Sequence, residues 1–343
     1  MLAADRLAAE LGVGRLWVKD ESSRLGLPSF KILGASWGVY RAVETRFGAF
    51  LPWAEIADLA AQLRPRLPLA LAAATDGNHG RAVARMARLL GLEARIFVPE
   101  GTARARIEAI TAEGAGCEVV AGTYDDAVAR SAQEESERCL VISDTSWPGY
   151  TDVPGWVIEG YSTIFWEVDD ALAEGGRPAP DVVVVQVGVG ALAAAAARHY
   201  RRGPAMVAVE PTQAACVLAS VQAGALVTIP GPHDSIMAGL NCGTPSVVAW
   251  PDVSAGYDLY LAIPDERARQ GMRALAREGI VAGETGAAGV GALFELLEDE
   301  ARDARAHLGL GPTANVLVVC TEGATDPAGY EAIVGAAPRG RDH

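Results

Sequence analysis

The sequence predicts an α/β protein built on mostly parallel sheets. Strand-like and helix-like segments alternate along almost the whole chain, as in repeated βα units. The apolar residues come mainly from Ala, Val and Leu, and only 6% of the chain is aromatic, which is usual for helices packed on buried parallel strands. With 343 residues, the chain is long enough for two open three-layer αβα domains.

In the first half, each apolar run of strand length is followed by a segment with helical periodicity. The helix expected at 80–90 ends at Gly91, because glycine favours the left-handed conformation found just past a helix end. The strands are expected at 16–19, 69–74, 94–98, 117–120 and 140–143, and the helices at 2–11, 32–45, 80–90, 103–113 and 124–137.

The second half repeats the alternation after a segment rich in Gly, Pro and Trp at 147–155. Residues 174–180 and 224–251 contain many Gly and Pro residues, and we expect the longer segment to be a functional loop. Residues 338–343 are expected to be disordered. The strands are expected at 182–187, 206–209 and 316–320, and the helices at 157–173, 191–201, 212–223, 265–278 and 290–299.

The charge balance and the hydropathy pattern exclude two classes of partner. Lys and Arg number 29 against 43 Asp and Glu, and a net charge of −14 argues against nucleic acid or an anionic membrane surface. The longest uncharged apolar run, at 182–197, contains Gln186 and is shorter than the roughly 18 residues that a membrane span needs.

The start of the chain and the cysteines indicate a reducing compartment. No basic region followed by an apolar stretch and a cleavage site opens the sequence, so we expect a cytoplasmic protein. The 5 cysteines are scattered and include no CxxC pair, which favours reduced thiols over a disulfide framework. We expect no metal site.

Lys31 is the first candidate catalytic residue. It follows Ser29 and Phe30 at the start of the expected helix 32–45, where the positive helix end disfavours the charged form of a lysine. A lysine with a lowered pKa can form a Schiff base. Its position alone does not establish catalysis, because most lysines at helix starts are solvated.

A second candidate segment joins the strand 69–74 to the helix that follows it. Residues 75–80 are Thr-Asp-Gly-Asn-His-Gly, and a turn of small polar residues presents side chains and N–H groups to a ligand at the edge of a parallel sheet. Capping of the helix by Asp76 or Asn78 is the alternative explanation. His79 has the further alternative of a purely structural hydrogen bond.

A third segment, Gly188-Val189-Gly190-Ala191-Leu192-Ala193, opens a helix directly after an apolar strand. It matches the dinucleotide fingerprint G-x-G-x-x-G/A, and Glu210 lies where a ribose-binding acid is expected. An NAD-dependent oxidoreductase is therefore one hypothesis. The same N–H groups would bind any phosphate monoester, and a glycine turn needed only for close packing is a further alternative.

Two more strands end in side chains that suit a ligand. Cys320 and Thr321 stand at the carboxyl end of the strand 316–320, where a thiol or hydroxyl could hydrogen-bond a heterocyclic nitrogen. Asp144 follows the strand 140–143 and adds a carboxylate at another strand end. A helix cap is the alternative role for Asp144.

Together these motifs resemble those of the fold-type II pyridoxal phosphate (PLP) enzymes, the tryptophan synthase β-like family. Within it they are most similar to the ammonia-lyases that act on 2,3-diaminopropionate. That family normally has several tens of residues ahead of the first motif. The resemblance implies a large PLP-binding domain at 1–33 and 157–343 and a smaller inserted domain at 34–156. The matching segments are 19–22, 29–31, 75–80, 144–145, 237–240, 283–286 and 321–327.

The resemblance also implies a role for each matching residue. Lys31 would bind PLP covalently as a Schiff base, and Asn78 would contact the 3′-oxygen of the cofactor. Thr321, with Cys320 as a second candidate, would face the pyridine nitrogen. The phosphate would be held by Gly188, Val189, Gly190, Ala191 and Leu192.

The implied reaction is α,β-elimination of 2,3-diaminopropionate to pyruvate and ammonia. Asp76 and Asp144 would remove the α-proton of the D and L enantiomers respectively, and an acidic residue near the β-carbon suits a leaving ammonium group. A serine or threonine dehydratase and a β-replacement synthase are alternatives within the family. A non-catalytic ligand-binding relative is an alternative of another class. Homodimers are usual in the family, so we expect one here.

Overall fold

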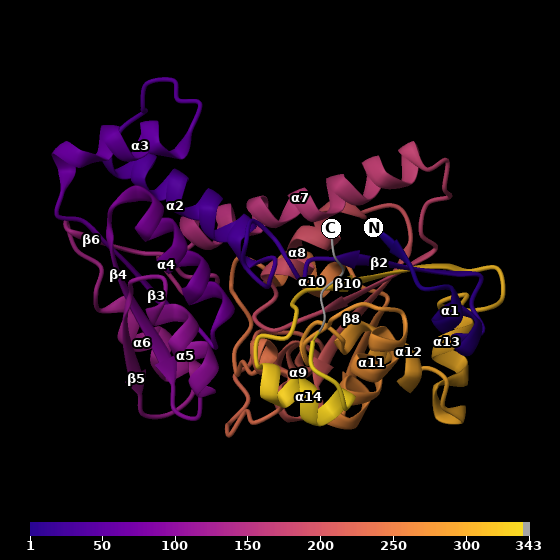
Figure 1. Ribbon diagram of the computed structural model, residues 1–343. Coiled ribbons are helices and arrows are strands. Elements are labelled where there is room, and N and C mark those ends of the chain that lie inside the picture. The colour runs from indigo at the N-terminus through magenta and orange to yellow at the C-terminus, as the bar shows by residue number, and fades with distance from the viewer. Residues whose placement is uncertain (339–343) are drawn as a thin grey trace. The chain divides into compact units, whose positions relative to one another are not determined.

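The computed structural model describes residues 1–338, and its chain divides into two compact units (Figure 1). Unit 1 comprises Met1–Phe30 and Tyr161–His343, and unit 2 comprises Lys31–Gly160. Lys31, expected in the large domain at 1–33 and 157–343, is the first residue of unit 2. Apart from Pro338, the tail expected to be disordered lies outside the described residues.

The strands and helices alternate through both units. The strands are β1 (Leu2–Ala3), β2 (Arg15–Asp20), β3 (Ala70–Ala74), β4 (Glu93–Pro99), β5 (Gly116–Val120), β6 (Cys139–Val141), β7 (Val182–Gln186), β8 (Ala205–Pro211), β9 (Leu259–Ile263) and β10 (Asn315–Cys320). The helices are α1 (Asp5–Leu11), α2 (Lys31–Phe47), α3 (Ile56–Leu63), α4 (Asn78–Leu90), α5 (Arg104–Thr111), α6 (Tyr124–Ala132), α7 (Asp152–Glu174), α8 (Ala191–His199), α9 (Cys216–Ala223), α10 (Trp250–Ala255), α11 (Asp265–Arg277), α12 (Ala288–Glu295), α13 (Arg302–His307) and α14 (Pro327–Val334). Short 3-10 helices occupy Arg64–Arg66, Thr212–Ala214, Ala238–Leu240 and Asp299–Ala301.

Unit 1 is built on a six-stranded sheet in the order β1-β2-β10-β7-β8-β9. Its strands pair in parallel except for β1, which runs antiparallel to β2. Every residue of β7 is buried, as expected for a central parallel strand covered on both faces. In register, Cys320 at the end of β10 stands beside Asp20 at the end of β2, so the ends of these strands meet at one edge of the sheet.

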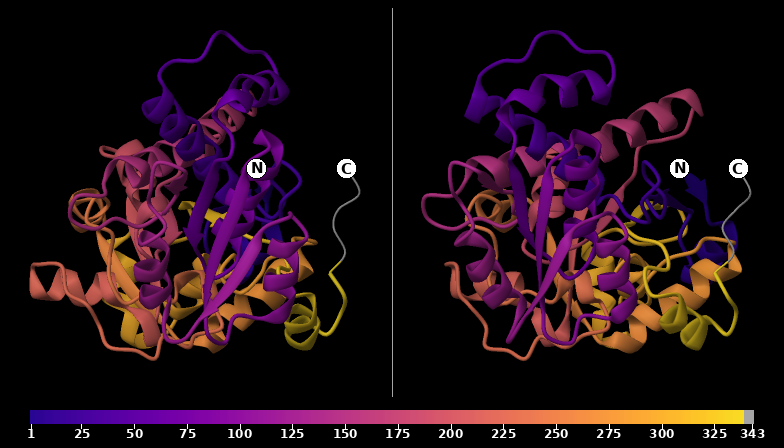
Figure 2. Two further views of the ribbon diagram at one scale, coloured as in Figure 1. Left: turned by 90° about the vertical axis from the view of Figure 1, so that its left-hand side faces the viewer. Right: turned by 60° about the vertical axis from the view of Figure 1, so that its left-hand side comes forward.

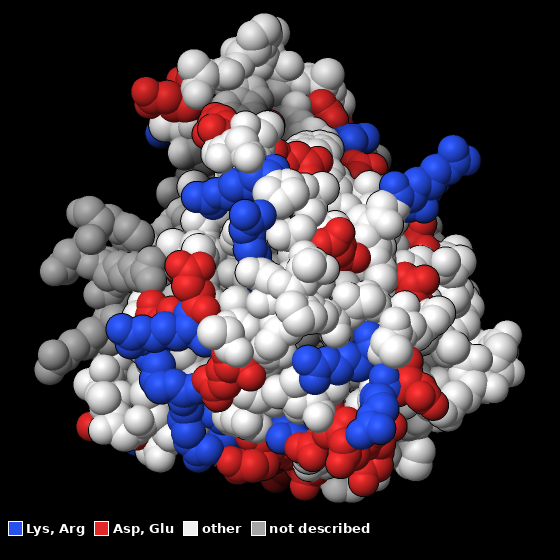
Figure 3. All heavy atoms as spheres, turned by 90° about the vertical axis from the view of Figure 1, so that its right-hand side faces the viewer, with Lys and Arg blue, Asp and Glu red and all other residues white. Residues whose placement is uncertain are grey.

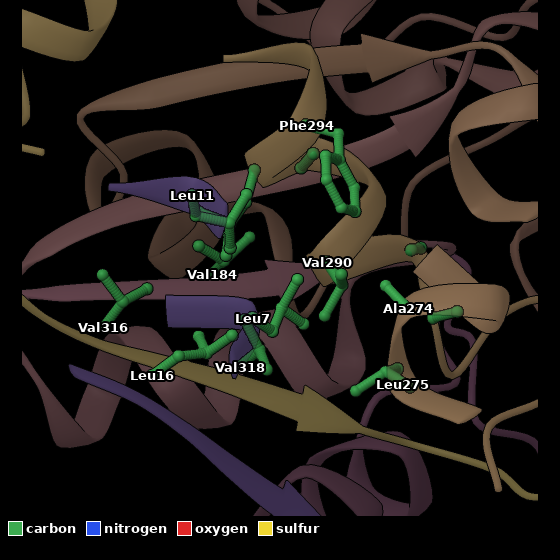
Figure 4. Packing of buried hydrophobic residues seen from close by; sticks show 14 of the residues in the cluster. Leu7, Leu11, Leu16, Val184, Ala274, Leu275, Val290, Phe294, Val316 and Val318 are labelled. Atoms are coloured by element: carbon green, nitrogen blue, oxygen red, sulfur yellow. The ribbon is translucent and has the colours of Figure 1, made fainter. Parts of the chain in front are cut away.

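The main core of unit 1 lies between this sheet and the helices α1, α11 and α12. Figure 4 shows Leu7 and Leu11 of α1 packed near Leu16, Val316 and Val318 of the sheet. All these side chains are almost completely removed from solvent. At roughly 1.5–3 kcal/mol for each large aliphatic side chain buried, this cluster is a main source of the stability of unit 1.

Unit 2 is built on a four-stranded parallel sheet in the order β5-β4-β3-β6. Figure 2 shows its strands side by side. The sequence of β3 is Ala-Leu-Ala-Ala-Ala and all five residues are buried, so its small side chains leave room for α4, which packs on β3 and β4. At Gly80 of α4 an added Cβ would lie 2.4 Å from Thr75 Cγ2, which shows how closely the helix approaches the end of the strand.

The expected α/β fold class is confirmed, and several element boundaries differ from the expected ones. Helix α7 begins at Asp152 rather than at 157, and α4 begins at Asn78 rather than at 80. Helices α3, α10, α13 and α14 and strand β9 are not among the expected elements, and β1 occupies the start of the helix expected at 2–11, so α1 begins only at Asp5. All but one residue of β9 are only partly buried, so this edge strand lacks the strong apolar run that marks the central strands. Within the loop expected at 224–251, the structure has only a 3-10 turn and the start of α10.

The surface carries both signs of charge. On the face drawn in Figure 3, basic and acidic side chains are interspersed rather than gathered into one basic area. No helix within residues 1–338 is long and apolar enough to cross a membrane.

We expect Gly80→Ala to destabilise the protein by about 1–3 kcal/mol, because the new methyl group would overlap the buried side chains of Thr75 and Ile96. Gly155→Ala is the matched control. It also replaces a helical glycine by alanine, but the added Cβ meets no atom within 4 Å. Urea denaturation of both variants measures the difference. Equal free energies of unfolding would contradict the close approach of α4 to β3.

Candidate active site

In unit 2 the structure brings Lys31 and Asp144 together. Lys31 is the first residue of α2, and Asp144 follows β6. Lys31 Nζ lies 2.6 Å from Asp144 Oδ2, and Tyr124 donates a hydrogen bond of 3.1 Å to Asp144 Oδ1. The Asp144 side chain is only 5% exposed and that of Lys31 19% exposed, so water screens this ion pair weakly.

These contacts hold Asp144 in its ionised form. Burial opposes ionisation of the carboxyl group, but the positive charge of protonated His79, the ion pair with Lys31 and the hydrogen bond from Tyr124 together outweigh it, so the pKa of Asp144 lies well below its usual range. His79 adds to this effect only when its ring is protonated. Tyr124 carried no signal in the sequence, because a tyrosine at a helix start matches no motif.

Asp76 has the opposite electrostatic environment. Burial raises its pKa to about 8, and the negative charge of Asp144 adds to the shift, while Arg106 and Lys31 oppose it. The turn around it is fixed by a hydrogen bond of 2.8 Å from Gly77 N to Thr75 Oγ1. Two carboxylates whose pKa values are pushed apart by their surroundings are a frequent arrangement in acid–base catalysis.

Asn78 and His79 form the first turn of α4. His79 is buried, and its Nε2 lies 2.7 Å from the carbonyl oxygen of Ile142, to which it donates as the neutral ring. Its Nδ1 lies 3.9 Å from Asp144 Oδ2, beyond hydrogen-bond distance. Burial lowers the pKa of His79, so the ring is neutral near pH 7. The bond to Ile142 favours a structural role for His79, whereas Asn78 is partly exposed at the turn.

In unit 1 the turn 188–190 leads directly into α8 (Ala191–His199). Gly190 has a φ of 104° and precedes the first helical residue, and no side chain caps this helix. The first N–H groups of an α-helix have no partner within the helix, so an anion can accept from them. Val189, Gly190 and Ala191 are buried, which gives such an anion a site largely shielded from water. The turn therefore fits the phosphate group of PLP.

Glu210 does not act as the ribose-binding acid that the dinucleotide hypothesis requires. Its two carboxylate oxygens accept hydrogen bonds of 2.8 Å from the backbone N–H groups of Val217 and Leu218, in the first turn of α9. The side chain is buried, with 1% of the residue exposed. Glu210 is therefore a helix cap, which the spacing of the sequence could not distinguish from a ligand contact.

Thr321 and Cys320 have different surroundings although they are adjacent. Thr321 Oγ1 accepts a hydrogen bond of 2.9 Å from Gln186 Nε2. Cys320 belongs to the hydrophobic core, and its thiol lies 3.5 Å from the carbonyl oxygen of Glu322. Successive side chains of a strand point to opposite faces, and burial raises the pKa of this thiol well above its usual value. The placement of Cys320 therefore favours a packing role, and Thr321 is the better partner for a ring nitrogen.

The motifs 283–286 and 321–323 lie against each other in unit 1. Gly283 N donates to the carbonyl oxygen of Glu322 at 3.0 Å, and Thr285 N donates to Glu322 Oε1 at 3.1 Å. At Gly286 an added Cβ would lie 2.4 Å from the Glu322 carbonyl oxygen, so this contact needs glycine. Phe30 N also donates to the carbonyl oxygen of Thr321, which fixes the residue just before Lys31 within unit 1.

The motif 19–22 contributes to a partly buried ion-pair network. Lys19 Nζ lies 2.6 Å from Glu21 Oε1 and 2.7 Å from Glu167 Oε2, and Arg24 donates to both carboxylates. Glu21 is completely buried. Removing one member of such a network leaves an uncompensated buried charge, so this motif has a structural role in the loop that follows β2.

These features define a class of protein, the fold-type II PLP enzymes. The features are two parallel α/β units, a lysine at a helix start and a glycine turn that fits a phosphate. The chain belongs to the family described as pyridoxal-phosphate dependent enzyme, whose model matches residues 1–322. The expected cofactor is therefore confirmed as PLP, and NAD is not supported.

Among curated relatives, diaminopropionate ammonia-lyase of Salmonella typhimurium is 35% identical over 96% of this chain and 85% of its own length. The Escherichia coli K12 enzyme of that name is 34% identical over 97% and 86%.

Solved structures agree with the sequence matches. The crystal structure of Escherichia coli diaminopropionate ammonia-lyase in complex with D-serine has a TM-score of 0.89 and 33% identity, over 97% of this chain and 86% of that one. The same enzyme in complex with an aminoacrylate-PLP azomethine reaction intermediate has a TM-score of 0.85. A fungal L-serine ammonia-lyase from Rhizomucor miehei, at 21% identity and a TM-score of 0.77, shares the fold.

The cap by Glu210 leads to a test of stability against pH. Burial raises its pKa to about 7 from 4.5, although its backbone hydrogen bonds lower it. The folded state thus binds the proton more tightly than the unfolded state. Ionisation of Glu210 therefore lowers the free energy of unfolding as the pH rises from about 4.5 to about 7. Urea denaturation across this range should show the wild type losing stability relative to Glu210→Gln. The exposed Glu300→Gln is the control, and a difference independent of pH for Glu210→Gln would contradict the assignment.

Proposed function

We propose that this chain catalyses the PLP-dependent elimination of ammonia from both enantiomers of 2,3-diaminopropionate. The observation that carries the proposal is the pair of acidic residues around Lys31: Asp144 is ionised and bound to the lysine, and Asp76 has a raised pKa. The curated relatives are named as diaminopropionate ammonia-lyases. The overall reaction consumes one water and yields pyruvate and two molecules of ammonia.

We assign each contact with PLP to one of the polar groups described for the candidate site. Lys31 would hold PLP covalently, Asn78 would contact its 3′-oxygen, residues 188–192 would bind its phosphate, and Thr321 would donate to its ring nitrogen. When bound, PLP withdraws electrons from the α-carbon of an amino acid and so makes its α-proton removable. A hydroxyl partner leaves the ring nitrogen without a full positive charge, which suffices when a leaving group departs from the β-carbon.

The proton transfers are assigned to the two carboxylates. We assign removal of the α-proton of the D enantiomer to Asp76. For the L enantiomer we assign it to Asp144 acting together with Lys31, because Asp144 Oδ2 holds Lys31 Nζ at 2.6 Å. A strongly acidic carboxylate is a weak base by itself, so its pairing with the amine matters for proton removal on this side.

The substrate class is proposed from the charge of the leaving group. The β-substituent of 2,3-diaminopropionate is an ammonium group, and a nearby carboxylate favours it over the neutral hydroxyl of serine or threonine. We further propose a cytoplasmic homodimer, which rests on the sequence pattern and the family resemblance.

The covalent role of Lys31 is tested by Lys31→Ala. Purified wild-type protein loaded with PLP is expected to be yellow, and the variant should lose the visible absorption of the bound cofactor and its turnover. Absorption spectra and pyruvate release measure both effects. Arg41→Ala, at a partly exposed site elsewhere on α2, is the control and should keep the colour. A variant at Lys31 that retains the same spectrum would refute the assignment.

The substrate is tested by comparing pyruvate release from D- and L-2,3-diaminopropionate, serine and threonine. Asp76→Asn should lower turnover of the D enantiomer by about 10²–10⁴-fold, which is the usual contribution of a general base, while turnover of the L enantiomer persists. Asp144→Asn should affect the L enantiomer more strongly. Equal losses for both enantiomers in either variant would contradict the two assignments, and faster turnover of serine or threonine would favour a dehydratase.

The pH dependence should also separate the two enantiomers. Asp76 must be ionised to accept a proton, and its pKa is raised to about 8. Turnover of D-2,3-diaminopropionate should therefore rise with pH up to about 8, whereas Asp144 is already ionised across this range. The ratio of kcat/KM for the D enantiomer to that for the L enantiomer, measured against pH, should increase through this interval. Parallel profiles would show that Asp76 is not the base that distinguishes them.

A further inference from the structure

Gln186 is a buried polar residue to which the proposed reaction gives no role. It is the last residue of β7 and is 3% exposed. Its Nε2 lies 2.9 Å from the carbonyl oxygen of Val319, 3.0 Å from that of Thr285 and 2.9 Å from Thr321 Oγ1. The side chain thus connects the ends of β7 and β10 with the turn 283–286, all within unit 1.

The neighbours of Gln186 leave only one orientation of its amide. The carbonyl oxygens of Val319 and Thr285 can only accept hydrogen bonds, so the amide nitrogen must face them. A flipped amide would place Oε1 against two carbonyl oxygens. In the observed orientation Oε1 is buried and has no hydrogen-bond partner within residues 1–338. The unpaired buried oxygen is unfavourable. The flipped amide would be worse, because its oxygen would then face the acceptors that now surround Nε2, so the observed orientation is preferred.

This orientation decides the role of the Thr321 hydroxyl. The amide nitrogen has two hydrogens for three acceptors, so one N–H is shared between two of them. Because this nitrogen donates and does not accept, the Thr321 hydroxyl cannot donate to it and can only accept. The hydroxyl proton therefore points away from Gln186. Within residues 1–338 no protein group accepts it, which leaves Thr321 as a donor toward a ligand.

We propose that Gln186 is a positioning residue that makes Thr321 a hydrogen-bond donor and so keeps the ring nitrogen of bound PLP unprotonated. This inference rests on the proposed contact of Thr321 with that nitrogen. A donor stabilises the neutral nitrogen, which has a lone pair, and disfavours the protonated nitrogen, which needs an acceptor. Without Gln186 the hydroxyl could rotate and accept from a protonated ring.

The test uses holoenzyme loaded with PLP that carries ¹⁵N at the ring nitrogen. In the wild type the ¹⁵N resonance should remain that of a neutral nitrogen throughout the pH range in which the protein is folded. In Gln186→Met, which keeps the bulk and loses the donor, the nitrogen should take up a proton about tenfold more readily, a rise of one pKa unit. Gln186→Glu is the second variant, because a carboxylate can accept the Thr321 proton and should shift the resonance in the same direction.

Variants of Thr321 show whether Gln186 acts through it. Adding Gln186→Met to Thr321→Val should leave the resonance unchanged, whereas in the Thr321→Ser background the effect of Gln186→Met should persist. The affinity of the apoprotein provides a readout without NMR: the wild type should bind PLP about fivefold more tightly than 1-deaza-PLP, which has no ring acceptor, and this ratio should fall toward one in Gln186→Met. Thermal unfolding identifies any variant that fails to fold.

Two results would overturn the inference. One is an unchanged resonance and an unchanged affinity ratio in folded, PLP-loaded Gln186→Met. The other is an effect of Gln186→Met that persists in the Thr321→Val background. Neither depends on turnover, so a protein that binds PLP but releases no pyruvate from 2,3-diaminopropionate would refute the proposed function and leave this inference standing.

Discussion

Parallel pairing of buried strands is the constraint on which both parts of the candidate site depend. Strands such as β3 and β7 are buried along their whole length, so polar side chains are displaced to the residues at and just beyond their carboxyl ends. In a parallel sheet these ends share one edge. The turn after β3 carries Asp76, and β7 ends at Gln186 just before the turn into α8. In each unit, the carboxyl edge of the sheet therefore determines where the polar side chains of the candidate site lie.

Within this arrangement, burial determines how each ionisable group behaves. Asp144 loses most of its water but gains Lys31 and Tyr124, and it remains ionised. Asp76, in the same unit, has its pKa raised chiefly by burial. Glu210 is also buried, yet its oxygens are used by the first turn of α9. A buried carboxyl group is therefore held ionised, kept protonated to a higher pH or used as a helix cap, according to the partners that the fold supplies.

Much of the fold and of the candidate site followed from local patterns. Apolar runs and glycine positions predicted the central strands and most helices, and the motifs around Lys31 and Asp76 stood at the expected turns. The edge strand β9 was missed because its partly exposed residues give no clear periodicity. Cys320 was paired with Thr321 on sequence proximity, although the alternation of side chains along a strand places it in the core.

The sequence by itself determined the α/β class, the family motifs and the candidate residues for PLP binding, because each depends on residue type and short-range spacing. The tertiary structure alone decided which partners those residues meet. Gln186 and Thr321 are 135 positions apart, and Lys31 and Asp144 are 113 apart. No local pattern encodes such pairs, since they form only when the strand ends of each sheet are brought to one edge. The direction of a hydroxyl proton and the charge of a carboxylate are therefore properties of the folded chain.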